Sequence, residues 1–510
     1  MREALGLVLT AALAAPLLAQ DAAPARPRLE LSLEETVKRA LENNANIAVE
    51  RFDPEASAQS VREARGAYDP FLTSTISLSN RTELATSAFS GATEVETETT
   101  IYNFGVTQLL PTGGLLDVDF TNDRIDTNNA FNNFNPKYSA GLNAALTQPL
   151  LKNFRIDAQR QQLRVAKKNR EISDAQFRQI VLNTAAGVRQ LYYDLIYAID
   201  NMVVTRKSLD LAKKFLDENQ IKVRVGTLAP LDVVAAESEV AGRDEQVILA
   251  EVALENAQDA LKRSIFPSNS PETWNVDIVP TDRASGEPVA IDADAALARA
   301  LQNRTDVLVA RKALESAQIS AEYGRNQTLP GADLVASYGA TGVGGTKLTR
   351  DVPGGTITER VEGGYGDALG QVTGIDFPTW RLALNLSYPI RNRAASARSA
   401  RFKVARDQAE ASLRLLELNV AAEVRSAARA VVANAKRVDA TRAARVLQER
   451  RLDAESKRFA AGMSTNFLVT QAQRDLAVQE VAELRAMADY RKSLVNFERV
   501  QEAGGGVILP

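Results

Sequence analysis

Apolar residues recur at the three- and four-residue spacing of a heptad along two very long stretches of the chain. The first series runs from Val181 to Val223 and resumes, after a short break, from Val233 to Leu261. The second runs from Val424 to Phe459. Sustained heptads are typical of helices that supercoil against one another. No proline interrupts residues 157–225 or 394–461, so each stretch predicts a helix roughly 100 Å long at about 1.5 Å per residue.

Two glycines interrupt the helical stretches. Gly226 and Gly462 each lie in a short segment that follows a long helical pattern and precedes another. Glycine readily adopts the left-handed conformation that ends a helix. The sequence therefore predicts two antiparallel helical hairpins, with turns at these glycines. The helices alone are equally compatible with an ordinary filamentous coiled coil, so they do not define the architecture.

Apolar and polar residues alternate in four shorter segments. The alternation is clear over Tyr138–Thr147 and Trp380–Tyr388, and weaker over Leu72–Leu78 and Leu334–Tyr338. About ten residues with one apolar face, one polar or small face and aromatic ends are typical of a transmembrane barrel strand. A soluble sheet with one solvated face is the alternative for any single strand. The aromatic residues predicted at the membrane interface are Tyr138, Trp380 and Tyr388.

The order of these elements occurs twice in the chain. Residues 40–44 (ALENN) resemble residues 300–304 (ALQNR), and Pro70 corresponds to Pro330 at the same offset. Each half runs helix, proline, strands, proline, long helix, glycine turn, long helix. A repeat of this kind indicates one structural unit used twice rather than two unrelated domains.

The N-terminus has the pattern of an export signal. Arg2 precedes an apolar run over Leu5–Ala19, and the polar pair Gln20-Asp21 follows. No later stretch of about twenty residues is apolar throughout, so the mature chain would cross a membrane only with strands. The predicted segments are a signal peptide at 1–19, a first repeat at 20–266, a linker at 267–291, a second repeat at 292–500 and a C-terminal tail at 501–510.

Four clear strands cannot close a pore within one chain. Because an open sheet edge cannot lie in lipid, closure requires several chains, and three would contribute about twelve strands, a plausible barrel size. A further hairpin is predicted from Tyr102 to Asn122, with no counterpart in the second half. This insertion either extends a rim or adds strands to the barrel.

Composition removes most enzyme classes. The chain has no cysteine and no histidine, and its formal net charge is −3. A Cys/His zinc site, a Ser-His-Asp triad and a Cys-His nucleophile are therefore excluded. The near-neutral charge argues against a nucleic-acid partner. The acidic residues follow helix faces at coiled-coil spacing, so we expect no catalytic residues, no metal site and no cofactor.

The duplicated unit of strands and long hairpins resembles the TolC family of outer-membrane efflux proteins over nearly the whole mature chain. The resemblance implies a mostly α fold with β, as a homotrimer that forms a barrel of about twelve strands in outer-membrane lipid. Its hairpins would form a twelve-helix tunnel through the periplasm, and the linker at 267–291 an equatorial belt. The matching segments are Gln148–Leu151, Val225–Leu228 with Asp232, Ala461-Gly462, Asn466–Leu468 and Ala472-Gln473.

The resemblance also implies a function. Such a protein is the exit duct of a tripartite efflux or type I secretion system, and it passes small molecules or polypeptides outward. Its hairpin tips dock on a periplasmic adaptor (membrane fusion) protein, which links it to an inner-membrane pump of RND or ABC type. The sequence names neither the cargo nor the pump. The turn residues expected to meet the adaptor are Gly226, Thr227, Leu228, Gly462, Met463 and Ser464.

The predicted periplasmic aperture departs from the family pattern. In the family, the segment after the second glycine narrows the tunnel, commonly with carboxylates, and nearby Tyr and Arg latch the helices. Here Met463 follows that glycine in place of the latch Arg, and Leu468 and Gln471 stand where family members place Asp. We expect an apolar, neutral constriction that gates by dewetting; the alternative is that Phe467 and Leu468 pack in the coiled-coil core. The aperture residues predicted are Asp232, Phe459, Phe467, Leu468 and Gln471.

A different class of function is also compatible with long hairpins. The chain could be a coiled-coil spacer of the cell envelope, or the periplasmic adaptor itself. An adaptor of this kind carries a small β-rich insertion between its hairpin helices. Here only residues 226–230 and 462–465 separate the helices, which favours the duct.

Overall fold

The computed structural model describes residues 26–283, 287–352 and 355–501. The predicted signal peptide and residues 502–510 of the predicted tail lie outside the described residues. Two compact units make up the chain. The helical unit comprises the chain up to Asn44 together with Gly187–Glu287 and Arg437–Lys492, and the sheet unit comprises Ala45–Ala186, Pro288–Lys436 and the chain from Ser493.

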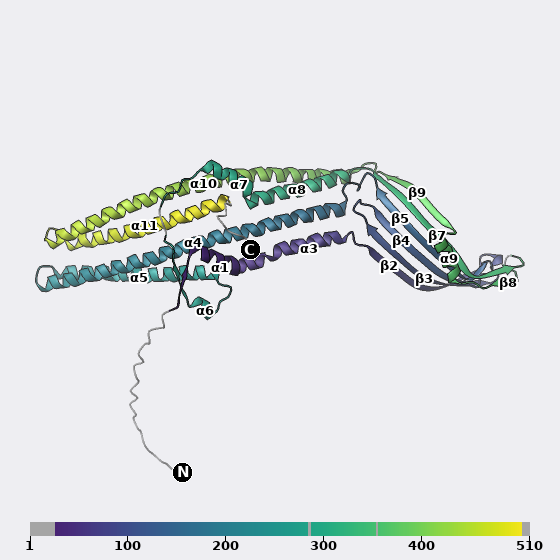
Figure 1. Ribbon diagram of the computed structural model, residues 1–510, viewed down its shortest axis with the longest axis horizontal. Helices are drawn as coiled ribbons and strands as arrows, with labels where there is room; N and C mark the ends of the chain where they lie inside the picture. The colour runs from purple at the N-terminus through teal and green to yellow at the C-terminus, as the bar shows by residue number, and fades with distance from the viewer. Residues whose placement is uncertain (1–25, 284–286, 353–354, 502–510) are drawn as a thin grey trace, which may run out of the picture. The chain divides into compact units, whose positions relative to one another are not determined.

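Four long helices dominate the chain, as the heptads predicted (Figure 1). Two of them continue from the sheet unit into the helical unit, where each turns back on itself as a hairpin. Their lengths of 67 and 68 residues correspond to roughly 100 Å each. The helices are α4 (Ala158–Arg224), α5 (Pro230–Ile265), α10 (Arg393–Ala460) and α11 (Asn466–Gln501).

The two hairpin turns have the same geometry. Gly226 and Gly462 adopt φ of 78° and 74°, the left-handed conformation predicted for them. In the first turn the N–H of Thr227 donates to the carbonyl of Lys222 at 2.9 Å, and in the second Met463 donates to Arg458 at 2.8 Å. Each glycine N–H donates to a carbonyl three residues back. This is the Schellman pattern, which satisfies the last carbonyls of a helix.

The heptad residues form the helix contacts. Val181, Val188 and Leu195 are at most 2% exposed, and Val424 and Val438 are fully buried. These positions confirm the hydrophobic periodicity.

Arg445 stands at a heptad position of the second series, between Val438 and Leu452, where an apolar residue is expected. It is charged because its side chain binds a buried carboxylate of the facing helix. Its guanidinium bonds to Glu483 of the facing helix, and Nη1 lies 3.2 Å from Glu449. The hydrogen bond with Glu483, with its negative charge, raises the pKa of Arg445. The position therefore replaces an apolar contact by a charged one.

A small parallel ladder accompanies the hairpins in the helical unit. Strands β1 (Arg28–Leu31) and β6 (Asp277–Pro280) pair in parallel, and β6 lies within the predicted linker. Gln258 of α5 bonds to both main-chain groups of Ile278, at 2.9 and 3.0 Å. The sequence does not predict this ladder, since four-residue strands leave no clear alternation. The remaining helices of this unit are α1 (Leu33–Asn43) and α6 (Pro271–Trp274).

One antiparallel sheet forms the core of the sheet unit (Figure 1). Its strands follow the order β2-β3-β4-β5-β7, and β9 and β8 both pair with β7, at its start and its end respectively. The strands are β2 (Phe71–Leu84), β3 (Glu94–Leu109), β4 (Leu115–Thr127), β5 (Phe134–Pro149), β7 (Gly331–Arg350), β8 (Ile357–Val361) and β9 (Pro378–Ser387). The helices of this unit are α2 (Ala45–Glu50), α3 (Phe52–Gly66), α7 (Ala293–Asn303), α8 (Thr305–Asn326), α9 (Tyr365–Gly374) and the short η1 (Ala88–Ser90).

The inserted hairpin is part of this sheet. Its strands β3 and β4 lie between β2 and β5, and each is hydrogen-bonded on both sides. Of the two possibilities for Tyr102–Asn122, the structure therefore has the one in which the hairpin adds strands.

Helix α9, which the sequence does not predict, packs against one face of the sheet. Ala368 and Val372 are buried against Ala140 of β5. At Gly342 and Gly344 of β7 a Cβ atom would lie 2.1 and 2.2 Å from carbonyl oxygens of this segment, so only glycine fits there. Among the described residues, no helix is both long and apolar enough to cross a membrane.

We predict that Tyr192 holds β1 and the end of β6 to helix α4. Its buried hydroxyl donates to the carbonyl of Leu31 at 2.9 Å and lies 3.0 Å from Oδ2 of Asp282. Tyr192→Phe removes the hydroxyl, while the N–H groups of Thr281 and Leu33 still donate to Leu31 and Asp282 at 3.1 and 2.6 Å. The change should therefore lower the free energy of unfolding at pH 8 by about 0.5–1.5 kcal/mol, the net value of one hydrogen bond. Chemical denaturation of the purified protein measures this, with Tyr197→Phe on the same helix as control.

The same residue gives a pH dependence. Burial, reinforced by the nearby Asp282 carboxylate, raises the pKa of Tyr192 to about 12, above its ordinary value of about 10. The stabilisation is therefore complete below about pH 10 and lost as the pH rises towards 12. The stability difference between wild type and Tyr192→Phe should shrink over that range; a constant difference would contradict the assignment.

Candidate functional site

The hairpin turns present an exposed apolar surface. Val225 and Leu231 are 68% and 76% exposed on the first hairpin, and Met463 is 67% exposed on the second. Both turn glycines and Thr227 are also exposed, while Leu228 and Ser464 are half-buried. Every turn residue predicted to meet a partner is therefore at least partly accessible in the single chain.

The predicted aperture residues divide into two groups. Phe459 packs against Phe215 of α4, with ring centroids 5.7 Å apart, and the Lys222 ammonium lies 4.0 Å from its ring centroid. Phe467, in contrast, is 72% exposed and Leu468 is 39% exposed. Phe459 therefore belongs to the contact between the hairpins, whereas Phe467 projects away from it.

The buried face of α11 near the tip consists of other residues. Val469, Ala472 and Leu476 are 2%, 0% and 9% exposed. In the single chain they, and not Phe467, fill the coiled-coil core. Gln471 is half-buried beside them.

Asp232 lies in the first turn of α5, where a carboxylate suits the helix dipole. Its main-chain carbonyl accepts a hydrogen bond from Nδ2 of Asn466 at 3.1 Å. Asn466 in turn accepts from Nδ2 of the buried Asn219 at 3.0 Å. A chain of polar groups therefore joins α5, α11 and α4 at the tip.

Ion pairs tie the two hairpins together above the tip. Glu239 of α5 binds Arg474 of α11, and Arg243 on its own helix lies 2.8 Å away. Although burial opposes ionisation of Glu239, the hydrogen bonds from the two arginines outweigh it and lower its pKa.

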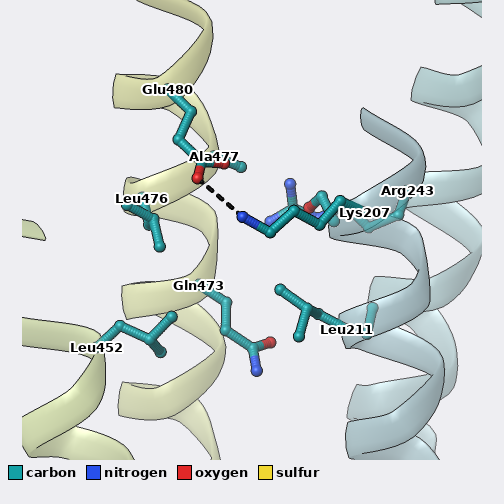
Figure 2. Close-up of a pocket in the computed structure, with 10 residues that line it drawn as sticks. Lys207, Leu211, Arg243, Leu452, Gln473, Leu476, Ala477 and Glu480 are labelled. Carbon is teal, nitrogen blue, oxygen red and sulfur yellow. Dashed lines mark hydrogen bonds and ion pairs between the residues drawn. The ribbon is translucent and has the colours of Figure 1, made fainter. Parts of the chain in front are cut away.

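A second ion pair crosses between the hairpins nearby. Lys207 Nζ of α4 lies 3.2 Å from Oε1 of Glu480 of α11, across a recess that Leu211, Leu452 and Gln473 help to line (Figure 2). The sequence does not reveal this cluster, because each member occupies an ordinary charged position on its own helix. Only the docking of the hairpins brings them together.

One face of the sheet is apolar. Directly paired residues share a face of an antiparallel sheet, and one such row contains Val106, Val118, Ala144, Tyr338 and Trp380. The adjacent row on one side contains Phe104, Phe120 and Leu142, and the adjacent row on the other side contains Leu146 and Leu382. Trp380 is 77% exposed on this face, at one end of the alternating segment, and Tyr388, just after β9, is 59% exposed at the other. Tyr138 instead packs edge-on against Tyr365 of α9, with ring centroids 6.4 Å apart.

The opposite face is polar. Asp117, Asp119 and Asp123 project from β4 on this side, and Thr107 donates to Asp117 at 2.8 Å. Ser139 of β5 donates to Asp123 at 3.2 Å. Hydroxyl groups thus pair with two of these three carboxylates.

Two coiled-coil hairpins and a sheet with one apolar and one polar face are the arrangement expected of an outer-membrane channel. A family model described as outer membrane efflux protein matches residues 36–265 and 296–500. The chain belongs to this outer membrane efflux protein family. It is an outer-membrane protein that extends into the periplasm and serves as an efflux channel.

Solved structures share the fold across nearly the whole chain. A membrane protein from Pseudomonas aeruginosa is 18% identical, with 92% of this chain and 93% of that chain covered and a TM-score of 0.64. The Campylobacter jejuni CmeC outer membrane channel is 16% identical, with 92% of this chain and 86% of that chain covered and a TM-score of 0.62. The open state of the Neisseria gonorrhoeae MtrE outer membrane channel is 18% identical, with 94% of this chain and 89% of that chain covered and a TM-score of 0.60. No protein of curated function matches the chain by sequence.

We predict that Glu239 stabilises the docked state of the hairpins. Glu239→Gln removes the charge that binds Arg474 and should raise the single-channel conductance several-fold, because the hairpins separate more readily. Planar-bilayer recording measures this effect. Glu237→Gln, an exposed neighbour on α5, is the matched control and should leave the conductance unchanged.

The ion pair also predicts opening in acid. Because the pKa of Glu239 is lowered, its stabilisation is present above the ordinary glutamate pKa near 4.3 and is lost as the pH falls below it. Wild-type conductance should therefore rise below about pH 4, and Glu239→Gln should lack that rise. An equal rise in both proteins would remove Glu239 from the explanation.

Proposed function

We propose that the protein is a homotrimeric exit duct of a tripartite efflux or type I secretion system. The observation that carries this proposal is the sheet, whose apolar face suits lipid and whose polar face suits a water-filled lumen. In the part of the chain that the structure describes, no strand pairs with the outer edge of β2 or of β9, and an open edge is not stable in lipid. A single copy would therefore not span the membrane. Three copies follow the symmetry that the family resemblance implies.

The hairpin tips are the proposed docking site for a periplasmic adaptor. Their exposed apolar side chains, Val225, Leu231 and Met463, could be covered by a helical partner. The two turns share the same Schellman geometry, so each copy would present two similar tips. An inner-membrane pump, of RND or ABC type, would deliver small molecules or polypeptides through that adaptor.

The tunnel entrance is the proposed gate. Phe467, with Leu468 beside it, is free of the coiled-coil core of its own chain, which supports a position at the three-chain axis. Gln471, one turn further along α11, adds no charge. Three copies of such a segment would form an apolar, neutral constriction that closes by dewetting. The charge cluster at Glu239 would hold the hairpins in that closed state.

The proposed duct can be tested in membranes. Heat-modifiable trimers in the outer-membrane fraction, with ion conductance after reconstitution, are the expected result. A mature protein that stays in the water-soluble periplasmic fraction would contradict it and favour a coiled-coil spacer.

We predict that the constriction lacks a carboxylate ring. Micromolar divalent or trivalent cations should leave the wild-type conductance nearly unchanged, whereas Gln471→Asp should make it sensitive to block, because three carboxylates would bind the cation. Phe467→Ala should raise the conductance at least two-fold. Val478→Ala, three helical turns away and 58% exposed, is the control. Strong block of the wild type would refute the neutral gate.

A further inference from the structure

The two outermost strands of the sheet have free edges. Among the described residues, no strand lies beyond β2 at one side or beyond β9 at the other. We propose that β9 of one copy pairs in antiparallel fashion with β2 of the next, so that three copies close a ring of about eighteen strands. The inference rests on the proposed trimer and specifies its barrel.

Strand direction permits this closure. Every neighbouring pair across the sheet, from β2 through β3, β4, β5 and β7 to β9, is antiparallel. Six alternating strands leave β2 and β9 running in opposite directions. The edge of one copy can therefore meet the edge of the next without a parallel pair, and the whole ring stays antiparallel.

The two strands of the inserted hairpin, β3 and β4, belong to the wall of the sheet and count among its six strands. Strand β3 pairs along the whole of β2, from Phe71 to Leu84, and β4 pairs with β5 from Leu115 to Ile125. A hairpin that only extended a rim would leave β2 bonded to β5. Here two full strands separate them, so each copy contributes six strands where the count from clear alternation was four.

The side chains of the two edges match in polarity. Leu72, Ile76 and Leu78 of β2 are 69%, 77% and 71% exposed, and Leu382 and Leu386 of β9 are 65% and 72% exposed. In each strand the even-numbered residues lie on the apolar face of the sheet. Because a slip of one residue would move apolar side chains to the polar face, even-numbered residues must pair with even-numbered residues.

The ends of the strands suggest the register. Pro70 directly precedes β2, and Pro389 lies two residues after β9. Alignment of these ends places Leu72 opposite Leu386 and Ile76 opposite Leu382. On the polar face, the same register places Thr75 opposite Ala383.

The consequence is a wider barrel. With strands about 4.8 Å apart and tilted about 40°, eighteen strands give a backbone diameter of about 35 Å, against about 24 Å for twelve. The cross-section enclosed by the backbone roughly doubles. The six-stranded wall of each copy is therefore the basis for a wide outer mouth.

Cysteine cross-linking tests the edge contact, since the natural chain has no cysteine. Thr75→Cys and Ala383→Cys in one chain lie on opposite edges of the same sheet, about 24 Å apart at the usual strand spacing, so any disulfide must join two copies. Mild oxidation of outer membranes should yield covalent dimers and trimers. Replacing Ala383→Cys by Arg381→Cys or Asn385→Cys tests registers shifted by two residues, and the pair that cross-links most efficiently identifies the register. The pair Thr121→Cys and Ala383→Cys is the control, because Thr121 lies on the interior strand β4.

Imaging of the unmodified protein gives a second measurement that no substitution can disturb. Single-particle images of trimers in lipid nanodiscs, viewed down the barrel, should show a ring about 35 Å across between backbones. A ring of about 24 Å, or the absence of cross-links for every pair in trimers that conduct ions, would overturn the eighteen-stranded closure and leave the duct intact. Failure to form trimers or to conduct ions would instead refute the proposed function itself.

Discussion

A strand edge in hydrocarbon needs a hydrogen-bonding partner, because lipid supplies neither donors nor acceptors. The arrangement of the sheet unit depends on this constraint. Strands β3, β4 and β5 are each paired on both sides by their own chain, whereas the outer edges of β2 and β9 are free for another copy to cover. The apolar rows on one face and the carboxylates on the other follow from the same condition, since a closed wall has one side in lipid and one in water.

The helical unit meets a different requirement, which is to hold long helices together without a thick core. Heptad residues such as Val188 and Leu195 supply narrow apolar contacts along each hairpin. Where the two hairpins meet, polar and charged groups add to the apolar contacts. Asn219, Glu239 and Glu480 bond to partners on the other hairpin, beside the ring contact of Phe215 with Phe459. Because these ion pairs depend on ionised carboxylates, the contact between the hairpins responds to pH.

The sequence predicted the features whose physical cause is local or periodic. Heptads and missing prolines predicted α4 and α10, glycines at 226 and 462 predicted the turns, and alternation predicted β5 and β9. It could not predict the parallel ladder at Ile278, which exists because Gln258 completes its hydrogen bonds. Helix α9 was missed for a similar reason: its support comes from glycines in a distant strand. The bonds between Glu239 and Arg474 also needed tertiary structure, since each residue alone is an ordinary charge on a helix surface.

The inserted hairpin has an effect beyond the number of strands. Its second strand, β4, carries Asp117, Asp119 and Asp123 on the polar face of the sheet. In a closed trimer these residues would amount to nine carboxylates in the outer lumen. Widening of the mouth and its negative potential would thus have a single origin, and removal of one hairpin would make the outlet both narrower and less attractive to cations.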